Sequence, residues 1–430
     1  MTGVLVLMAV VTCLLVTGIP IAIAIAISGL GAGWLVQGSH VFATLPLSLF
    51  TALNSFLLVA IPLFILMGEI MKRAGITEIL FEFVSKWVGH WPGGLGISTV
   101  ITSALGATIT GSSTANAASM AIAVVPPMLK RGYDAKFVLG LVAAGGTLGI
   151  LIPPSIPFLL YATITGESVA KLFIAGVIPG LVLSVLLILY VLLACMRGSV
   201  YQPMPKATWS ERWRATRRAS GALLLPVVVI GGLYTGFVTV TEAAGLGVAF
   251  SIFLSVVIYR SLIVSDIMPI LMATVQTTCM VMMITCCSVL LGNVLTTMEF
   301  AQQLATWLRT TGLNAWQFLI LVNVVLLLLG TVMDVLAILF IFIPIIFPLL
   351  GPLGIDPVWF AVMFVINMEI AVISPPVGLT LFVIAGATRR PVEEVTIGAM
   401  PFMAVLLLGL IIIGVFPSLS LWLPSQLMAR

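Results

Sequence analysis

The chain has 430 residues, of which 61% are hydrophobic and only 7% are charged. Soluble domains carry about 25% charged residues, so this composition excludes a soluble protein and predicts an all-α polytopic membrane protein in a lipid bilayer. The formal net charge of +4 is spread over loops, which concerns orientation in the bilayer and gives no indication of nucleic-acid binding.

The first half of the chain contains apolar runs that predict five crossings and one hairpin. The run between Lys86 and Lys130 contains no Asp, Glu, Lys or Arg. A spanning helix needs about 20 apolar residues, so this run must double back, and it predicts a hairpin at about 92–129. The crossings are expected near 3–17, 19–37, 53–71, 135–163 and 172–196.

The first hairpin has a polar centre, Gly111-Ser112-Ser113-Thr114-Ala115-Asn116. In a re-entrant hairpin this tip lies at mid-depth, where the first arm ends with unpaired carbonyls and the second begins with unpaired N–H groups. Such oxygens suit Na⁺, and a helix N-terminus favours an anion. Two other interpretations stay open: a short loop that joins two full spans, or small residues that pack helices together.

The crossing expected at 135–163 contains a helix break. The pair Pro153-Pro154 removes two backbone donors and clashes with the preceding turn. Broken helices within lipid are tolerated only where the freed backbone faces protein or a water-filled cavity. Gly145, Gly146 and Gly149 allow the chain before the break to unwind and turn carbonyls toward a ligand.

The second half repeats this arrangement. A hairpin is predicted at about 314–350, and Pro375-Pro376 breaks the crossing at 357–386. Asp334 lies at the centre of this hairpin, and a carboxylate within an apolar run is a functional candidate; the alternative is a helix N-cap. The crossings are expected near 219–239, 242–260, 268–297, 357–386 and 395–417.

The two halves are related by an offset of 222 residues. The offset pairs several turn formers: Pro126 with Pro348, Gly132 with Gly354, Asp134 with Asp356, Pro154 with Pro376, Gly176 with Gly398 and Pro179 with Pro401. The sequence therefore predicts repeats at 1–218 and 219–430, each with five transmembrane helices and one re-entrant hairpin. Because each half is expected to cross the membrane five times, an odd number, the second half enters from the opposite side. The two repeats are therefore inverted relative to each other. Interrupted helices at corresponding positions indicate a transport site at the membrane midplane.

Basic residues give the expected orientation. The densest group lies between Arg197 and Arg218, and positively charged loops stay in the cytoplasm. Lys72, Arg73 and Lys86 are then expected on the same side.

The sequence contains few residues that could form a catalytic site. The chain has two histidines, His40 and His90, and neither lies in a metal or catalytic cluster. An intramembrane hydrolase would need a base for Ser112 or Ser113, and the central spans contain no His or Lys. The sequence predicts a transporter, not an enzyme, and no cofactor.

The tip at 111–116, the tract Gly145–Ser155 and the later Ser374-Pro375-Pro376-Val377-Gly378 resemble the large membrane subunit of tripartite ATP-independent periplasmic (TRAP) transporters. The resemblance covers essentially the whole chain. It implies an elevator-type secondary transporter of the ion-transporter superfamily, located in the bacterial inner membrane. Such a transporter imports small organic acids, such as C4-dicarboxylates, sugar acids or keto acids, with Na⁺ as the coupling ion.

The resemblance also implies positions for the ligands. Each hairpin tip and its adjacent broken helix would form a Na⁺ site. By position, one site falls on Ser112, Ser113, Asn116, Gly145 and Gly149, and the other on Thr331, Asp334, Asn367 and Ala371. The substrate would lie between the tips, near Thr114, Pro154, Ser155, Pro376 and Thr380.

Two partners follow from the same resemblance: a small four-helix membrane subunit and a soluble periplasmic substrate-binding protein. Because the resemblance begins almost at Met1, the small subunit is expected to be a separate polypeptide. The alternative is a stand-alone ion-coupled carboxylate transporter or exchanger of the same architecture, which works without a binding protein.

Overall fold

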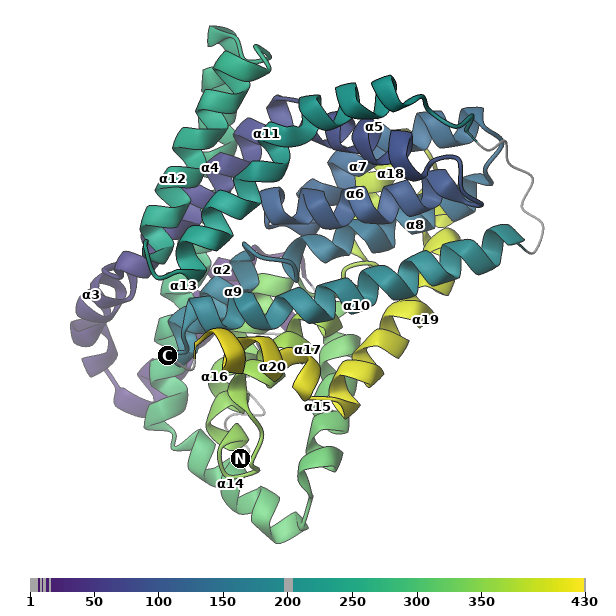
Figure 1. The fold of residues 1–430 in the computed structure, drawn as a ribbon. Coiled ribbons are helices and arrows are strands. Elements are labelled where there is room, and N and C mark those ends of the chain that lie inside the picture. Colours follow the sequence, from purple (N-terminus) through teal and green to yellow (C-terminus); the bar gives the residue numbers. More distant parts are fainter. Residues whose placement is uncertain (1–6, 8–9, 11–12, 15–16, 197–203, 429–430) are drawn as a thin grey trace.

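The computed structural model describes residues 7, 10, 13, 14, 17–196 and 204–428, and the regular elements in this part of the chain are all helices (Figure 1). The predicted all-α fold with interrupted helices is therefore confirmed. The expected first crossing, 3–17, lies largely outside the described residues.

The described helices of the first half are short except for the last, which has 28 residues. In chain order they are α2 (Ile21–Gln37), α3 (His40–Leu53), α4 (Ala60–Arg73), α5 (Ile76–Val88), α6 (Gly94–Thr110), α7 (Ser113–Lys130), α8 (Ala135–Thr147), α9 (Ile156–Thr165) and α10 (Val169–Met196). Short 3₁₀ turns, Phe56–Val59 and Leu148–Ile150, precede α4 and follow α8.

The described part of the second half contains more long helices than the first. Its helices are α11 (Trp209–Tyr234), α12 (Val240–Phe253), α13 (Val264–Thr297), α14 (Phe300–Thr311), α15 (Ala315–Gly330), α16 (Val335–Leu350), α17 (Pro357–Ala371), α18 (Leu379–Thr388), α19 (Val392–Val415) and α20 (Ser418–Leu427). A π-helical turn, Leu254–Ile258, extends α12.

Five helices of the described chain are long and apolar enough to cross a membrane: α10, α11, α12 with its π-helical turn, α13 and α19. A sixth span is possible if α3 and α4, which meet at a 57° bend, are counted together. Most of the shorter apolar helices are arms of the two hairpins or parts of the two interrupted helices.

Five helical segments were not predicted from hydropathy. The helices α3, α5, α14 and α20 fall where connections were expected. In α5, charged Glu78 and Lys86 interrupt the apolar run although the other face is buried. The basic segment before 219 was read as a loop, but α11 begins at Trp209, because Thr208 and Glu211 form a capping box that satisfies the first N–H groups.

The helix starts follow the 222-residue offset. Adding 222 to 113 and 135, where α7 and α8 begin, gives 335 and 357, where α16 and α17 begin. The paired Asp134 and Asp356 have the same local role, since each carboxylate accepts a backbone N–H bond at the start of an interrupted helix. The division into repeats at 218/219 and their opposite orientation stay predictions.

The helices pack in two groups that are mixed in sequence. One group contains α2, α3, α4, α11, α12 and α13, and the other contains the first hairpin with α8, α18 and α19. Figure 1 shows α4, α11 and α12 together at the upper left, with α6, α7, α8 and α18 at the upper right. The closest crossing joins α8 to α19, where a Cβ on Gly140 would lie 1.9 Å from the carbonyl oxygen of Gly398.

Candidate functional site

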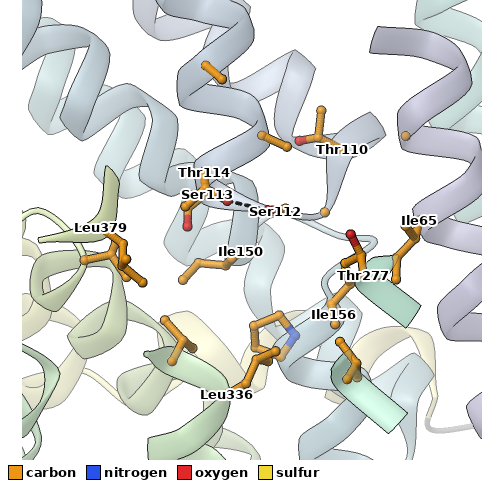
Figure 2. A pocket seen from close by; sticks show the side chains of 18 of the residues that line it. Ile65, Thr110, Ser112, Ser113, Thr114, Ile150, Ile156, Thr277, Leu336 and Leu379 are labelled. Atoms are coloured by element: carbon orange, nitrogen blue, oxygen red, sulfur yellow. Dashed lines mark hydrogen bonds between the residues drawn. The ribbon is translucent and has the colours of Figure 1, made fainter. Parts of the chain in front are cut away.

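A cavity of about 440 Å³ lies where the two hairpins and the two interrupted helices meet α4 and α13. The first tip contributes Thr110–Ala115, and the second contributes Asp334–Leu336. Figure 2 shows Ser112, Ser113 and Thr114 on one side of this cavity, with Leu336 on the opposite side. The two polar centres, more than 200 residues apart in sequence, therefore line one space.

The first tip presents the start of α7 to this cavity. Gly111 adopts a left-handed conformation with φ of 60°, which ends α6 and turns the chain. Ser112 is extended and does not cap α7 with its side chain; its hydroxyl lies 3.2 Å from that of Thr114 (Figure 2). The first N–H groups of a helix have no partner within it, so this end carries positive potential that favours an anion.

Both ends of the first break contact the first tip. A Cβ on Gly149 would lie 2.7 Å from the carbonyl oxygen of Ser112. A Cβ on Gly111 would lie 2.9 Å from the carbonyl oxygen of Pro154. Only glycine allows these backbone approaches, so the tip is seated directly on the interrupted helix.

Behind this tip lies a cluster of buried oxygen atoms. The amide nitrogen of Asn116 donates to the carbonyl oxygens of Ser103 and Gly146 at 3.1 and 3.3 Å. The Asn116 Oδ1 and Ser103 Oγ atoms are buried without a hydrogen-bond partner in the described chain. A Cβ on Gly145 would lie 2.7 Å from that Oγ. Unpaired hydroxyl and amide oxygens of this kind are ligands for a hard cation.

The structure thus brings together the five residues expected at the first ion site and adds Ser103. Sequence reasoning missed Ser103, because α6 also carries Ser98, Thr99 and Thr102, and all four side chains are buried. The Ser98 and Thr99 hydroxyls donate to backbone carbonyls of α6, whereas the Ser103 Oγ atom lies against Gly145 of α8.

The second tip has different chemistry. Asp334 lines the cavity and caps α16, with its Oδ2 accepting the N–H of Leu336 at 3.1 Å. The carbonyl oxygen of Thr331 accepts the N–H of Val377 at 3.2 Å, which joins the tip to the second break. The two interpretations offered for Asp334, a helix cap and a site residue, are compatible.

Asn367 and Ala371 contact the first arm of the second hairpin. The Asn367 amide donates to the backbone carbonyl and side-chain oxygens of Asn323, at 2.9 and 3.0 Å, while its own Oδ1 has no partner in the described chain. A Cβ on Gly330 would lie 2.3 Å from the Cβ of Ala371. Asn323 was not predicted from the sequence, although an amide in an otherwise apolar arm is a usable signal.

The residues expected at the substrate position separate into two groups. Thr114 lines the cavity, whereas Pro154, Ser155, Pro376 and Thr380 are not among its lining residues. The Ser155 hydroxyl instead caps α9 and bonds to the carbonyl oxygen of Ile150. Three polar residues of other helices line the cavity without having been predicted: Glu69 and Lys72 of α4, and Thr277 of α13.

Comparisons with known proteins agree with this architecture. Residues 7–419 match the family described as tripartite ATP-independent periplasmic transporter, DctM component. The chain is 40% identical over 384 residues to the C4-dicarboxylate TRAP transporter large permease protein DctM of Pseudomonas aeruginosa, covering 89% of this chain and 90% of that protein. It is 35% identical over 373 residues to the sialic acid TRAP transporter large permease protein SiaM of Vibrio cholerae, covering 87% of each.

The fold is also similar to a solved structure. The YdaH transporter of Alcanivorax borkumensis, described as having an unusual topology, superposes with a TM-score of 0.67 over 96% of this chain and 99% of that chain. At 14% sequence identity, this likeness concerns the fold alone.

Proposed function

Since this chain belongs to the DctM family of tripartite ATP-independent periplasmic transporters, we propose that it imports small organic acids across the bacterial inner membrane together with Na⁺. The chain is a multi-pass permease subunit and not an enzyme. The observation that carries the proposal is the single cavity lined by both hairpin tips, with the uncapped start of α7 at its wall.

The substrate class follows from the chemistry of this wall. An anionic carboxylate is favoured at the N-terminus of α7 by the helix dipole and the free N–H groups. The ammonium group of Lys72 adds a positive charge to the same cavity. C4-dicarboxylates are the first candidates, because the Pseudomonas aeruginosa relative is named for them; sugar acids and keto acids follow.

Sodium coupling rests on the unpaired oxygens beside the cavity. Ser103 and Asn116 at the first tip, and Asn367 near the second, offer hydroxyl or amide oxygens without partners in the described chain. Asp334 would supply the negative charge that the first tip lacks. When bound, Na⁺ would hold each tip against its interrupted helix, so ion binding would order the cavity before the anion enters.

The elevator mechanism fits the division into two packing groups. The group of α2, α3, α4 and α11 to α13 would stay fixed, while the hairpins and interrupted helices move with the substrate. The two proposed partners are the small four-helix membrane subunit and the periplasmic binding protein. A stand-alone carboxylate exchanger is the competing proposal, and a neighbouring gene for a secreted binding protein would count against it.

Uptake of radioactive succinate into liposomes tests this proposal. The reconstituted permease complex should accumulate succinate only when its binding protein and an inward Na⁺ gradient are both present. Replacing the Na⁺ gradient by K⁺ is the control. Equal uptake without the binding protein would support the stand-alone exchanger instead.

Replacement of Asp334 by asparagine tests the second ion site. Asparagine caps a helix as well as aspartate does, but it lacks the formal charge, so the Na⁺ concentration for half-maximal uptake should rise about tenfold. Asp134→Asn is the matched control, because Asp134 caps α8 and does not line the cavity. If both variants keep the Na⁺ dependence of the original protein, Asp334 acts only as a cap.

A further inference from the structure

A second cavity, of about 390 Å³, adjoins the first along α4 and α7. Three residues line both cavities: Glu69 and Lys72 on α4, and Ala118 on α7. The second cavity continues past these residues to Arg73, Gly75 and Glu78, at the turn between α4 and α5. The boundary between the two spaces is therefore built from one face of α4 and one face of α7.

The second cavity lies on the side of the membrane that carries the basic residues. Its wall includes Arg73, whose guanidinium contacts Asp266 at 2.9 and 2.6 Å and so joins α4 to the start of α13. The neighbouring α5 is joined to the basic start of α11 by the Lys86–Glu211 pair at 3.2 Å. Because basic segments stay in the cytoplasm, the second cavity lies between the first cavity and the cytoplasm.

The shared boundary carries one negative and one positive charge. The ammonium of Lys72 lies 3.4 Å from a carboxylate oxygen of Glu69. Lys72 is the one Lys or Arg among the described residues that line the first cavity, and the guanidinium of Arg73 is already engaged by Asp266. An anion that leaves the first cavity through the second therefore passes Glu69, which repels it, and Lys72, which attracts it.

This ion pair is suited to exchange. The Lys72–Glu69 contact is long, and both residues lie on α4. The side chain of Lys72 is 44% exposed and that of Glu69 is 22% exposed. Such partly exposed pairs are weak, so a carboxylate can compete with Glu69 for the ammonium. The Arg73–Asp266 pair differs, because its two contacts are shorter, at 2.9 and 2.6 Å, and the Asp266 side chain is only 6% exposed.

Building on the proposed function, we propose that Glu69 and Lys72 form a cytoplasmic gate for the substrate. On its way from the start of α7 to the cytoplasm, the substrate carboxylate replaces Glu69 as the partner of Lys72. Glu69 then regains the ammonium and displaces the anion into the second cavity. Lys72 and Glu69 are positioning residues with opposite effects on one anion, and that opposition distinguishes a gate from an ion pair that only stabilises the last turn of α4.

The test uses succinate enclosed within the liposomes. The binding protein, added outside, engages only complexes whose periplasmic face is outward, so the enclosed succinate meets their cytoplasmic side and inhibits uptake. In Lys72→Gln the half-inhibitory concentration of enclosed succinate should rise about fivefold, because the cation is lost. In Glu69→Gln it should fall by about twofold, because the competing carboxylate is removed.

The double variant provides a further readout. If Glu69 acts through Lys72, the double variant should behave like Lys72→Gln alone, since coupled residues are not additive. Lys86→Gln is the matched control, because it removes a lysine on the same side whose side chain lines neither cavity; its inhibition should match that of the original protein.

The outcomes separate the two proposals. Absence of succinate uptake by the unsubstituted complex would refute the proposed function for C4-dicarboxylates, and the gate with it. Normal uptake, with unchanged or equal shifts in Lys72→Gln and Glu69→Gln, would refute the gate alone. If Lys72→Gln fails to assemble, the direction of the Glu69→Gln shift still decides.

Discussion

Replacing Gly398 by leucine should prevent the permease from reaching its folded state. At this position a Cβ would lie 2.0 Å from the carbonyl oxygen of Lys136, and a Cβ on the facing Gly140 would lie 1.9 Å from the carbonyl oxygen of Gly398. The obstacle is backbone in both directions, so no side chain can rotate away. Helices α8 and α19 would have to separate along their closest crossing, where small residues normally allow membrane helices to pack.

The expected loss is large compared with ordinary core substitutions. Overpacking of a core costs about 1–3 kcal/mol, occasionally more. The free energy of unfolding of a natural protein is itself small, so such a loss can prevent folding. We expect no monodisperse protein after extraction of Gly398→Leu, measured by size-exclusion chromatography. The matched control is Gly386→Leu, since Gly386 is exposed and a Cβ there meets nothing within 4 Å. Similar yields for the two variants would contradict the close crossing.

Replacing Gly149 by alanine should strongly lower the rate of transport while the protein still folds. The added methyl would lie 2.7 Å from the carbonyl oxygen of Ser112 and 3.2 Å from the Cβ of Asn116. The first tip must then move away from the break, which separates the oxygens proposed to bind Na⁺. Displacement of this size in a reacting site lowers rates about a hundredfold, and we expect a similar decrease in initial succinate uptake.

Gly386→Ala is the control for this experiment as well, with uptake close to that of the original protein. Purified yield and thermal unfolding of Gly149→Ala should be measured alongside uptake. A folded Gly149→Ala permease with undiminished uptake would show that the contact between tip and break is not needed for transport.

Much of the membrane architecture was predictable because it depends on backbone chemistry. The Pro153-Pro154 and Pro375-Pro376 pairs cannot continue a helix, and the structure interrupts both helices there. Gly111 marks the first tip because it adopts a left-handed turn. The amphipathic α5 was missed for the opposite reason: its identity as a helix depends on burying one face against α6 and α11, which an apolar-run criterion does not detect.

The candidate site was only partly predictable. Asn116 and Asp334 are polar residues in apolar runs, and the sequence alone marks them as unusual. Lys72 gives no such signal, because a lysine at the end of a span reads as an orientation marker. Its position beside the cavity depends on how α4 packs against the hairpin, and that packing joins segments far apart in the chain.

The unequal caps of the two hairpins have a consequence for the substrate. Ser112 leaves the start of α7 open to an anion, whereas Asp334 fills the equivalent place at α16 with its own carboxylate. The cavity therefore favours an anion at the first hairpin and disfavours one at the second, although the two hairpins occupy corresponding positions in the two halves. A substrate carboxylate would therefore bind toward the start of α7, because at the start of α16 it would face the carboxylate of Asp334. The two similar hairpins thus give the substrate a preferred orientation in the cavity.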